Sequence, residues 1–215
     1  MSKAAIFDKD GVIVHTTRLH FEKWKRTFSK YNKKLTRDFL LKNMAGRSAK
    51  ENIKRHLDSS ISDEDLTKIL QEQLSFMLSM YDKYVTVVPG VIDFLKKLKD
   101  HNIPMALATS SRRESSDYVL DRLKIGTYFR SVINGDDVTH SKPHPEIYLT
   151  SARKLGVIPS SCVVFEDSIS GVQAAKKAGM KVILVMTSHA QKEIPSVDMA
   201  IKDFRKINVS DVKML

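Results

Sequence analysis

Short runs of consecutive apolar residues recur along this chain, and longer segments with a helical spacing of apolar residues separate them. A short apolar run between polar residues is typical of a strand that is buried on both faces. These runs cover residues 4–7, 105–108, 132–133, 162–165 and 182–185. The helical pattern covers residues 91–100, 114–123, 146–155 and 171–178. This alternation of strand and helix predicts an α/β fold with a doubly wound parallel sheet.

The segment from residue 16 to residue 85 has a different pattern. Apolar residues recur at helical spacing over residues 19–31, 39–44, 51–57 and 65–84, and no strand pattern interrupts them. Ser62 stands three residues before Asp65, which is a variant of the capping box and predicts Ser62 as the N-cap of the last helix. The pattern therefore predicts a core domain of residues 1–15 and 86–215, with a four-helix domain of residues 16–85 inserted into it.

Polar residues follow several of the predicted strands directly. Asp8 and Asp10 close the first run, with Gly11 after them, and later runs end in Thr109-Ser110-Ser111 and in Glu166-Asp167-Ser168. In a parallel sheet these strand ends meet in one crevice, so the side chains are expected to surround a single bound group. For the Asp-Lys-Asp-Gly run alone, an ordinary strand-to-loop turn is an equally good interpretation.

The residue types in this predicted crevice suit phosphoryl chemistry. One aspartate can attack phosphorus while its neighbour transfers a proton. Carboxylate and carbonyl oxygens are the ligands that Mg²⁺ prefers, and hydroxyls with backbone amides suit phosphate oxygens. A lysine, Lys142, stands in the run Ser-Lys-Pro-His-Pro and can neutralise a phosphoryl group.

Composition limits the location of the protein. Of its 215 residues 42% are hydrophobic, which suffices for a sizeable core. The single cysteine, Cys162, excludes an intramolecular disulfide and is interpreted as a buried thiol in a reducing compartment. No apolar stretch reaches the roughly 18 residues that span a membrane, and the residues before the first strand do not resemble a signal peptide. We therefore expect a cytoplasmic protein that does not bind a membrane.

The chain is basic, with 36 lysines and arginines against 25 acidic residues and a net charge of +11. The lysines are interleaved with acidic residues along amphipathic segments, so a solvated surface is favoured over a nucleic-acid interface. The positive field would still attract anionic substrates. The expected partner is a small phosphorylated molecule and not a nucleic acid, and the expected state is a monomer or a weak homodimer.

Four motifs in fixed order resemble those of the haloacid dehalogenase superfamily. They read F-D-K-D-G-V-I, A-L-A-T-S-S, S-K-P-H-P-E-I-Y and V-F-E-D-S-I-S-G-V-Q-A-A-K-K-A-G, and they extend over nearly the whole chain. The run with Thr16, His20 and Trp24, together with Gly46-Arg47-Ser48, is similar to the β-phosphoglucomutase-like branch, which includes the subfamily IA phosphatases. The resemblance implies a Rossmann-like core and identifies the predicted insertion as a cap domain.

The resemblance also implies roles for the acidic residues. Asp8 would attack phosphorus to form an aspartyl-phosphate, and Asp10 would protonate the leaving oxygen and then activate water or a second hydroxyl. Mg²⁺ would bind the Asp8 carboxylate, the Asp10 carbonyl and Asp167, and Glu166 would act on it directly or indirectly. Capping of the following helix by Asp167 or Ser168 is compatible with this role.

Further residues are expected to hold the phosphoryl group or the substrate. Thr109 would bind the transferring group, Lys142 would neutralise it together with Asp8, and relatives often have a cis peptide between this lysine and the next proline. The expected catalytic residues are thus Asp8, Asp10, Thr109 and Lys142. The expected substrate-binding residues are Lys9, Thr16, His20, Arg47, Ser48, Lys50, Ser110, Ser111 and Arg112.

The predicted insertion residues have two interpretations each. His20 either relays a proton to Asp10 or touches substrate, or it is an ordinary interface residue. Arg47 and Lys50 either bind the rest of an anionic substrate or are solvated surface charges. Trp24 is interpreted as part of the core of the insertion.

Four positions depart from the family pattern. Lys9 stands between the aspartates where an apolar residue is usual, and His15 replaces an aspartate. Ala49 and Gln73 stand where the mutases have an arginine and a lysine. We expect Lys9 to reach the cavity mouth and contact a second anionic group of the substrate, unless it extends outward into solvent.

These departures favour one activity over another. A mutase must hold the distal phosphate of a bisphosphate and exclude water, and the missing arginine and lysine weaken such a hold. The expected function is a Mg²⁺-dependent phosphatase for a small phosphorylated metabolite such as a sugar phosphate. β-Phosphoglucomutase is the alternative, and a non-catalytic basic binding protein is disfavoured because it would not require Asp8, Asp10, Lys142 and Asp167 together.

Overall fold

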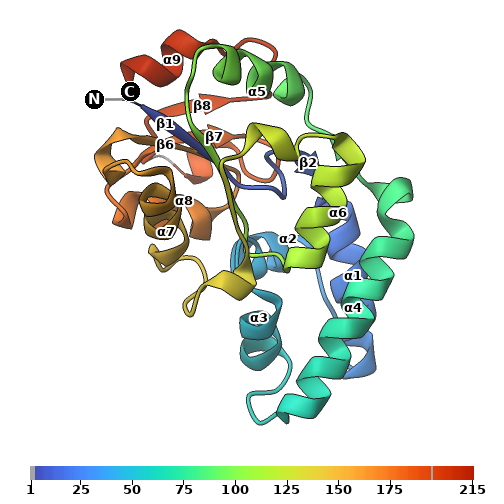
Figure 1. The fold of residues 1–215 in the computed structure, drawn as a ribbon. Coiled ribbons are helices and arrows are strands. Elements are labelled where there is room, and N and C mark those ends of the chain that lie inside the picture. Colours follow the sequence, from blue (N-terminus) through green and yellow to red (C-terminus); the bar gives the residue numbers. More distant parts are fainter. Residues whose placement is uncertain (1–2, 195) are drawn as a thin grey trace.

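A parallel sheet with helices on both faces forms the larger part of the molecule. The computed structural model describes residues 3–194 and 196–215, so Met1, Ser2 and Pro195 of the predicted core domain lie outside the described residues. Over this part of the chain the sheet has six strands in the order β5-β4-β1-β6-β7-β8 (Figure 1). The strands are β1 (Ala4–Phe7), β4 (Met105–Ala108), β5 (Ser131–Ile133), β6 (Cys162–Glu166), β7 (Lys181–Val185) and β8 (Met199–Ile201).

The two faces of the sheet bury separate apolar clusters. Ala5 and Phe7 of β1 belong to the cluster that includes α5 (Val91–Asp100), α6 (Arg113–Leu123) and α9 (Val209–Met214). Ala4 and Ile6 belong to the cluster on the other face, with α7 (Glu146–Leu155) and α8 (Ile169–Lys177). Since successive side chains of a strand point to opposite faces, burial on both sides explains the continuous apolar runs. The predicted doubly wound α/β fold is confirmed.

The strand order places a crevice at the carboxyl end of β1. This strand pairs in parallel with β4 on one side and with β6 on the other. The chain therefore continues from β1 in opposite directions across the sheet, and a doubly wound sheet binds its ligands at such a switch point. Asp8 follows β1, Thr109 follows β4 and Glu166 ends β6, so their side chains meet here.

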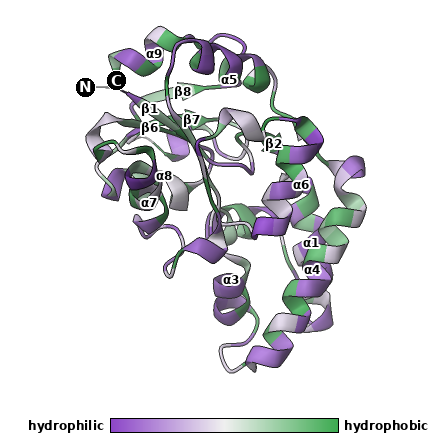
Figure 2. Cartoon of the chain, in the orientation of Figure 1, coloured by the Kyte–Doolittle hydropathy of each residue, from purple (hydrophilic) through white to green (hydrophobic). Residues whose placement is uncertain are grey.

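Residues 16–85, all of which the structure describes, form helices and loops without a strand. We call this segment the helical insertion. Its elements are α1 (Thr17–Lys30), α2 (Arg37–Phe39), the π-helical turn η1 (Leu40–Met44), α3 (Ala49–His56) and α4 (Asp63–Tyr84). It has an apolar cluster of its own, with Trp24 among its members as predicted. Hydrophobic and hydrophilic positions alternate along α1 and α4, which pack against each other (Figure 2).

A short two-stranded ladder flanks the helical insertion. β2 (Val14–His15) pairs antiparallel with β3 (Thr86–Val87). The segments that enter and leave the insertion thus run side by side.

Most predicted elements match the structure, with differences at short elements. Ser62 caps α4 as predicted, because its Oγ accepts a hydrogen bond from the Asp65 amide. The helix predicted over residues 39–44 is instead divided between α2 and the π-helical turn. The pattern missed β2, β3, β8 and α9, which are only two to six residues long. Short 3₁₀ turns complete the chain at Gly126–Tyr128, Gly135–Asp137, Pro159–Ser161 and Gln191–Glu193.

Candidate active site

A cavity of about 1300 Å³ is lined by the carboxyl end of the sheet and by the helical insertion. We call the sheet side the floor; it comprises Asp8, Asp10, Thr109, Asp167 and the side chains directly beneath them. We call the insertion side the roof. Its lining includes residues from α1, η1, α3 and α4. The two sides bring together residues that are far apart in sequence.

Lys142 lies beneath Asp8 and is fully buried. Its Nζ donates hydrogen bonds to Asp8 Oδ1 at 3.1 Å, to Glu166 Oε1 at 2.7 Å and to the Ala108 carbonyl at 3.3 Å. An ammonium group has three N–H donors, so each one has an acceptor. Lys142 is therefore held in one position on the same side of the sheet as Asp8.

Glu166 is saturated by protein donors. Besides Lys142, the Tyr148 hydroxyl donates to Oε1 at 2.8 Å, and the backbone amides of Asp167 and Ser168 donate to Oε2 at 2.8 Å each. A Cβ on Gly171 would lie 1.7 Å from Oε1, so glycine is required there. Both oxygens of Glu166 are therefore engaged by protein donors. Glu166 orients Lys142, and it is better suited to supporting a cation site through its neighbours than to binding the cation directly.

The floor carries an excess of negative charge. The pKa of Asp8 is raised to about 7, mainly by burial and also by Glu166, although Lys142 opposes the shift. Burial, Glu166 and Asp8 together raise the pKa of Asp167 well above its usual value. Ligand oxygens of Asp8, Glu166 and Asp167 all lie within 4.8 Å of one another. Three carboxylates with one lysine fit a divalent cation that prefers oxygen ligands.

Asp10 lies in a different environment from Asp8. Its Oδ2 accepts a hydrogen bond from Ser111 Oγ at 2.7 Å, and Lys9 Nζ lies 3.4 Å from the same oxygen. His20 Nε2 lies 3.3 Å from Oδ1. Burial acts to raise the pKa of Asp10, but Lys9 and His20 hold it well below its usual value. Asp10 is therefore ionised beside a lysine and a histidine, whereas Asp8 shares one lysine with a second carboxylate.

The position of Lys9 requires a correction. The sequence predicts this lysine either at the cavity mouth or extended into solvent, but its side chain is buried and does not line the cavity. Its Nζ donates to Ser115 Oγ of α6 at 2.8 Å and lies beside Asp10. Because a hydroxyl and a carboxylate both compensate the ammonium inside the protein, it has no need to reach solvent.

The three hydroxyls after β4 line the cavity together with Arg112. Thr109 is buried, and its Oγ1 accepts a hydrogen bond from the Ser111 amide at 3.1 Å. Ser110 Oγ donates to the carbonyl of Gly46 in the helical insertion at 2.7 Å. Arg112 lies farther out and pairs with Glu114 at 2.8 Å. The structure thus brings Thr109 close to Asp8, while Ser110 bridges to the roof.

The roof residues expected to bind substrate line the cavity in different ways. Thr16 is buried at the start of α1, and Lys50 is exposed. Arg47 pairs with Glu51 at 2.6 Å, and Ser48 caps α3 by accepting from the Glu51 amide. Arg47 and Ser48 are therefore engaged with α3, and the charge of Arg47 is partly compensated.

The loop before α3 is docked on the floor. Ser170 Oγ donates to the Ala45 carbonyl at 2.7 Å, next to the bond from Ser110 to Gly46. Gly46 has a φ of +78°, and a Cβ there would lie 2.2 Å from Ser170 Oγ. A side chain at this position would both strain the backbone and separate the roof from the floor.

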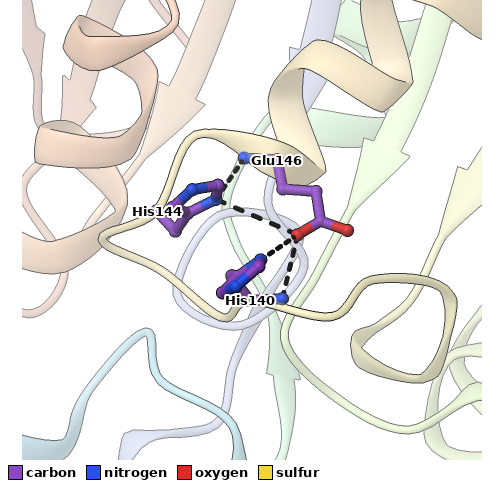
Figure 3. Close-up of side chains that lie close together, drawn as sticks. All are labelled: His140, His144 and Glu146. Atoms are coloured by element: carbon purple, nitrogen blue, oxygen red, sulfur yellow. Dashed lines mark hydrogen bonds and ion pairs between the residues drawn. The ribbon is translucent and has the colours of Figure 1, made fainter.

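The loop that carries Lys142 is fastened by Glu146 (Figure 3). This carboxylate accepts hydrogen bonds from the backbone amides of Thr139 and His140 at 2.9 Å each, and His140 Nδ1 lies 2.8 Å from it. The bond from Thr139 is the main reason why the pKa of Glu146 is lowered to about 2. His144 Nδ1 accepts from the Glu146 amide at 3.3 Å. The peptide bond between Lys142 and Pro143 is cis, as predicted.

Sequence reasoning missed several residues near the site. Tyr148 is the last residue of the quoted lysine motif, in the first turn of α7, and was given no role; its hydroxyl donates to Glu166. Ser188 Oγ donates to Asp167 Oδ2. Ser188 follows β7 closely, so the signal of polar residues after a strand was present there too. Lys23 lies three residues after His20, on the same side of α1, and lines the cavity.

Comparisons with known proteins identify the family. The model of the haloacid dehalogenase-like hydrolases matches residues 5–185. The chain is 37% identical over 182 residues to a phosphorylated carbohydrates phosphatase of Thermotoga maritima, covering 83% of this chain and 82% of that relative. It is 32% identical over 185 residues to a β-phosphoglucomutase of Bacillus subtilis, covering 83% and 80%. The crystal structure of β-phosphoglucomutase from Clostridium difficile superposes with a TM-score of 0.89 at 26% identity and covers 100% of this chain and 96% of that one.

The chain therefore belongs to the haloacid dehalogenase-like hydrolase family, which confirms the predicted family. It is an enzyme whose relatives are named as phosphatases and phosphoglucomutases. No helix in the described part of the chain is long and apolar enough to cross a membrane.

Proposed function

We propose that this protein is a Mg²⁺-dependent phosphatase that hydrolyses a small phosphorylated metabolite through an aspartyl-phosphate on Asp8. One observation carries the proposal. Asp8 is a buried carboxylate bonded to Lys142 and lining a large cavity, and a second cavity-lining carboxylate, Asp10, lies two residues away with His20 Nε2 3.3 Å from its Oδ1. A nucleophile held by a cation and an adjacent group that can exchange protons are what the reaction requires.

The reaction has two steps. In the first, an Asp8 oxygen forms a bond to phosphorus, the bond from phosphorus to the ester oxygen breaks, and Asp10 passes to that oxygen a proton that it takes up from His20. In the second, Asp10 takes a proton from water, the water oxygen attacks phosphorus, and the Asp8 carboxylate is released as phosphate forms. His20, 3.3 Å from Asp10 Oδ1, can relay the proton between Asp10 and the cavity. Lys142 and the Thr109 hydroxyl stabilise the charge on the transferring group.

Mg²⁺ fits the excess negative charge of the floor. The Asp8 and Asp167 carboxylates and the Asp10 carbonyl would hold it, and Glu166 would support the arrangement through Lys142 and the Asp167 amide. When bound, the ion would neutralise charge between the carboxylates and the phosphate oxygens.

We expect Mg²⁺ to raise the thermal unfolding midpoint of the wild type. Asp167→Asn should raise the midpoint without metal, because like charges no longer repel, and should abolish the Mg²⁺-dependent rise.

The helical insertion is proposed to act as a cap domain of residues 16–85 on a core of residues 1–15 and 86–215. Three observations support this division. The insertion has its own apolar cluster, the β2–β3 ladder marks its ends, and the Gly46 loop docks on the floor. Opening at the ladder would admit substrate, and docking would exclude water. The buried Cys162 is consistent with a cytoplasmic location.

β-Phosphoglucomutase activity is the second candidate, because the similar structure from Clostridium difficile bears that name. A single set of assays separates the two. Phosphate release is measured across a panel of sugar phosphates with Mg²⁺ or with a chelator, and β-glucose 1-phosphate with a bisphosphate primer is tested for conversion to glucose 6-phosphate. Phosphate release that requires Mg²⁺ and is lost in Asp8→Asn supports the phosphatase. Isomer conversion with little phosphate release would replace it by the mutase, and activity that survives Asp8→Asn would contradict both.

A further inference from the structure

Lys23 on α1 is a buried lysine without a counter-ion. Only 5% of the residue is exposed, and it lines the cavity. Among the residues that the structure describes, none makes a hydrogen bond or ion pair with its ammonium group. The Trp24 ring centroid lies 4.8 Å from Nζ, and the charge of Asp10 acts on Lys23 from beyond ion-pair distance. Burying an ionised amine without a partner is costly, so a partner supplied from the cavity would be strongly favoured.

Two amide side chains in the lining of the same cavity each have an oxygen that accepts no hydrogen bond from the described residues. Gln73 of α4 donates from Nε2 to Thr27 Oγ1 at 2.9 Å, and Asn52 of α3 donates from Nδ2 to the Met44 carbonyl at 3.0 Å. Their oxygens, Gln73 Oε1 and Asn52 Oδ1, are buried and accept no hydrogen bond from the described residues. Both residues line the same cavity and are about 95% buried or more. The roof therefore offers one cationic donor and two free acceptors.

We propose that Lys23, Asn52 and Gln73 select substrates that carry a carboxylate and neighbouring hydroxyls, so that the preferred substrates are phosphorylated hydroxy acids. This inference rests on the proposed phosphatase function. A substrate carboxylate would accept from Lys23, and substrate hydroxyls would donate to the two amide oxygens.

The site suits a carboxylate better than a second phosphate. One monovalent cation balances one carboxylate, whereas a phosphate dianion requires several donors such as an arginine fork or a row of amides. Free amide oxygens nearby would repel a dianion but accept from hydroxyls. Arg47, another cationic residue of the roof, is already paired with Glu51.

The location of Lys23 also fits substrate selection and not phosphoryl transfer. Its charge interacts with Asp10 and Lys9, so it lies on the side of the cavity where the leaving oxygen would depart. Burial lowers the pKa of Lys23 to about 8, with Asp10 opposing the shift, so the group is charged at neutral pH. The sequence assigned recognition of a second anionic group to Lys9, and the geometry assigns it to Lys23 instead.

Matched substrate pairs test the proposal. 3-Phosphoglycerate and glycerol 3-phosphate differ by a carboxylate in place of a hydroxymethyl group, and 6-phosphogluconate and sorbitol 6-phosphate differ in the same way. The wild type should prefer the acid of at least one pair by about 10-fold or more in kcat/KM, the size expected for a charge-assisted hydrogen bond. Lys23→Met should remove this preference while changing kcat/KM for the neutral partner less than threefold, and Lys23→Arg should retain part of it.

Two further variants separate selection from structure. Lys25→Met removes an exposed lysine from the same helix and should leave the preference intact. Gln73→Leu should lower kcat/KM for both members of the preferred pair by about 2- to 10-fold, the size expected for a neutral hydrogen bond, and leave their ratio unchanged.

p-Nitrophenyl phosphate, which has neither carboxylate nor hydroxyls, distinguishes failure of this inference from failure of the proposed function. If the wild type and Lys23→Met hydrolyse it equally but the wild type shows no preference for the acids, phosphatase activity holds and the role of Lys23 is wrong. A preference for fructose 1,6-bisphosphate over fructose 1-phosphate with none for the acids would assign the subsite to phosphate and contradict the carboxylate. Equal losses on both members of a pair in Lys23→Met would also contradict it. If no phosphate ester is hydrolysed, the proposed function itself fails.

Discussion

The floor and the roof of the cavity treat buried polar groups in opposite ways. On the floor, Lys142 has an acceptor for every N–H, and Glu166 accepts from five donors. On the roof, the amide oxygens of Asn52 and Gln73 are buried and have no hydrogen-bond partner among the described residues, and Lys23 lines the cavity without an ion-pair partner among them. The floor is ready for one chemical task before substrate arrives, whereas the roof is completed only by a ligand.

This difference separates catalysis from selection in physical terms. Preorganised donors and charges stabilise a transition state without reorganisation, so the fully engaged pair of Lys142 and Glu166 suits a fixed phosphoryl group. An unsatisfied buried donor or acceptor costs about 1–3 kcal/mol, and a ligand that satisfies it recovers this cost as binding energy. Ligands without the matching group leave the cost in place and are rejected. A roof of this kind sacrifices stability for specificity.

The largest expected effect follows from replacing the nucleophile on the floor. Asp8→Asn should lower kcat by about 10⁴-fold or more, because an amide cannot form the aspartyl-phosphate. The fold should persist, since burial already disfavours the charged form of Asp8. Phosphate release gives the rate, and thermal unfolding reports the fold.

Asp10→Asn is the matched comparison for this variant. It should slow both steps and let a phosphoenzyme accumulate, which intact-protein mass spectrometry would detect as added phosphate. Near wild-type turnover in Asp8→Asn would exclude covalent catalysis by this residue.

The next effect concerns the stability of the floor. Lys142→Met removes the cation shared by Asp8 and Glu166 and leaves two buried carboxylates without a cationic partner. We expect a loss of about 3–5 kcal/mol in the free energy of unfolding at pH 8. Denaturant titration measures the loss. A variant as stable as the wild type at this pH would show that the floor is not held together by Lys142.

The same substitution on the roof should have the opposite sign. Lys23→Met replaces an uncompensated buried charge by an apolar group and should raise the free energy of unfolding by about 2 kcal/mol at pH 7. The folded-state pKa of Lys23, about 8, lies below its ordinary value of 10.5. The cost of the charge is therefore present below pH 8 and is relieved as the pH rises from 8 toward 10.5, because the unfolded state then binds more protons.

The difference between Lys23→Met and the wild type should accordingly shrink over that pH range. Denaturant titrations at pH 7 and pH 9.5 test it, and Lys25→Met gives the effect of losing an exposed lysine. If Lys142→Met and Lys23→Met both destabilise the protein, the contrast between floor and roof is wrong.

The smallest expected effect concerns the hydrogen bond from Tyr148 to Glu166. Tyr148→Phe removes one of the five donors to Glu166, the hydroxyl at 2.8 Å. Because Glu166 keeps its bonds to Lys142 and to two amides, we expect a loss of about 1 kcal/mol in stability and little change in kcat. A large fall in kcat with unchanged stability would instead give Tyr148 a direct part in positioning Lys142.

The floor could be predicted from the sequence because local patterns encode it. Apolar runs define strands that are buried on both faces, and the polar residues at their ends converge in any parallel sheet with this strand order. Asp8, Thr109 and Glu166 follow from that rule, and the family motifs add Lys142. Ser188 obeys the same rule after β7 but stands outside the quoted motifs.

The roles of the lysines were decided by tertiary structure. Lys9 stands between two aspartates, and Lys23 stands between Glu22 and Trp24. Nothing in either local sequence shows that Lys9 contacts Ser115 of α6 while Lys23 lines the cavity without an ion-pair partner. Local sequence fixes where an element forms and which residues end it, since that depends on neighbours along the chain. Whether a buried charge is compensated depends on α3, α4 and α6, which pack against it from positions distant in sequence. For that reason the residues of the floor can largely be predicted from the sequence, whereas the selectivity proposed for the roof depends on how distant elements pack in the folded protein.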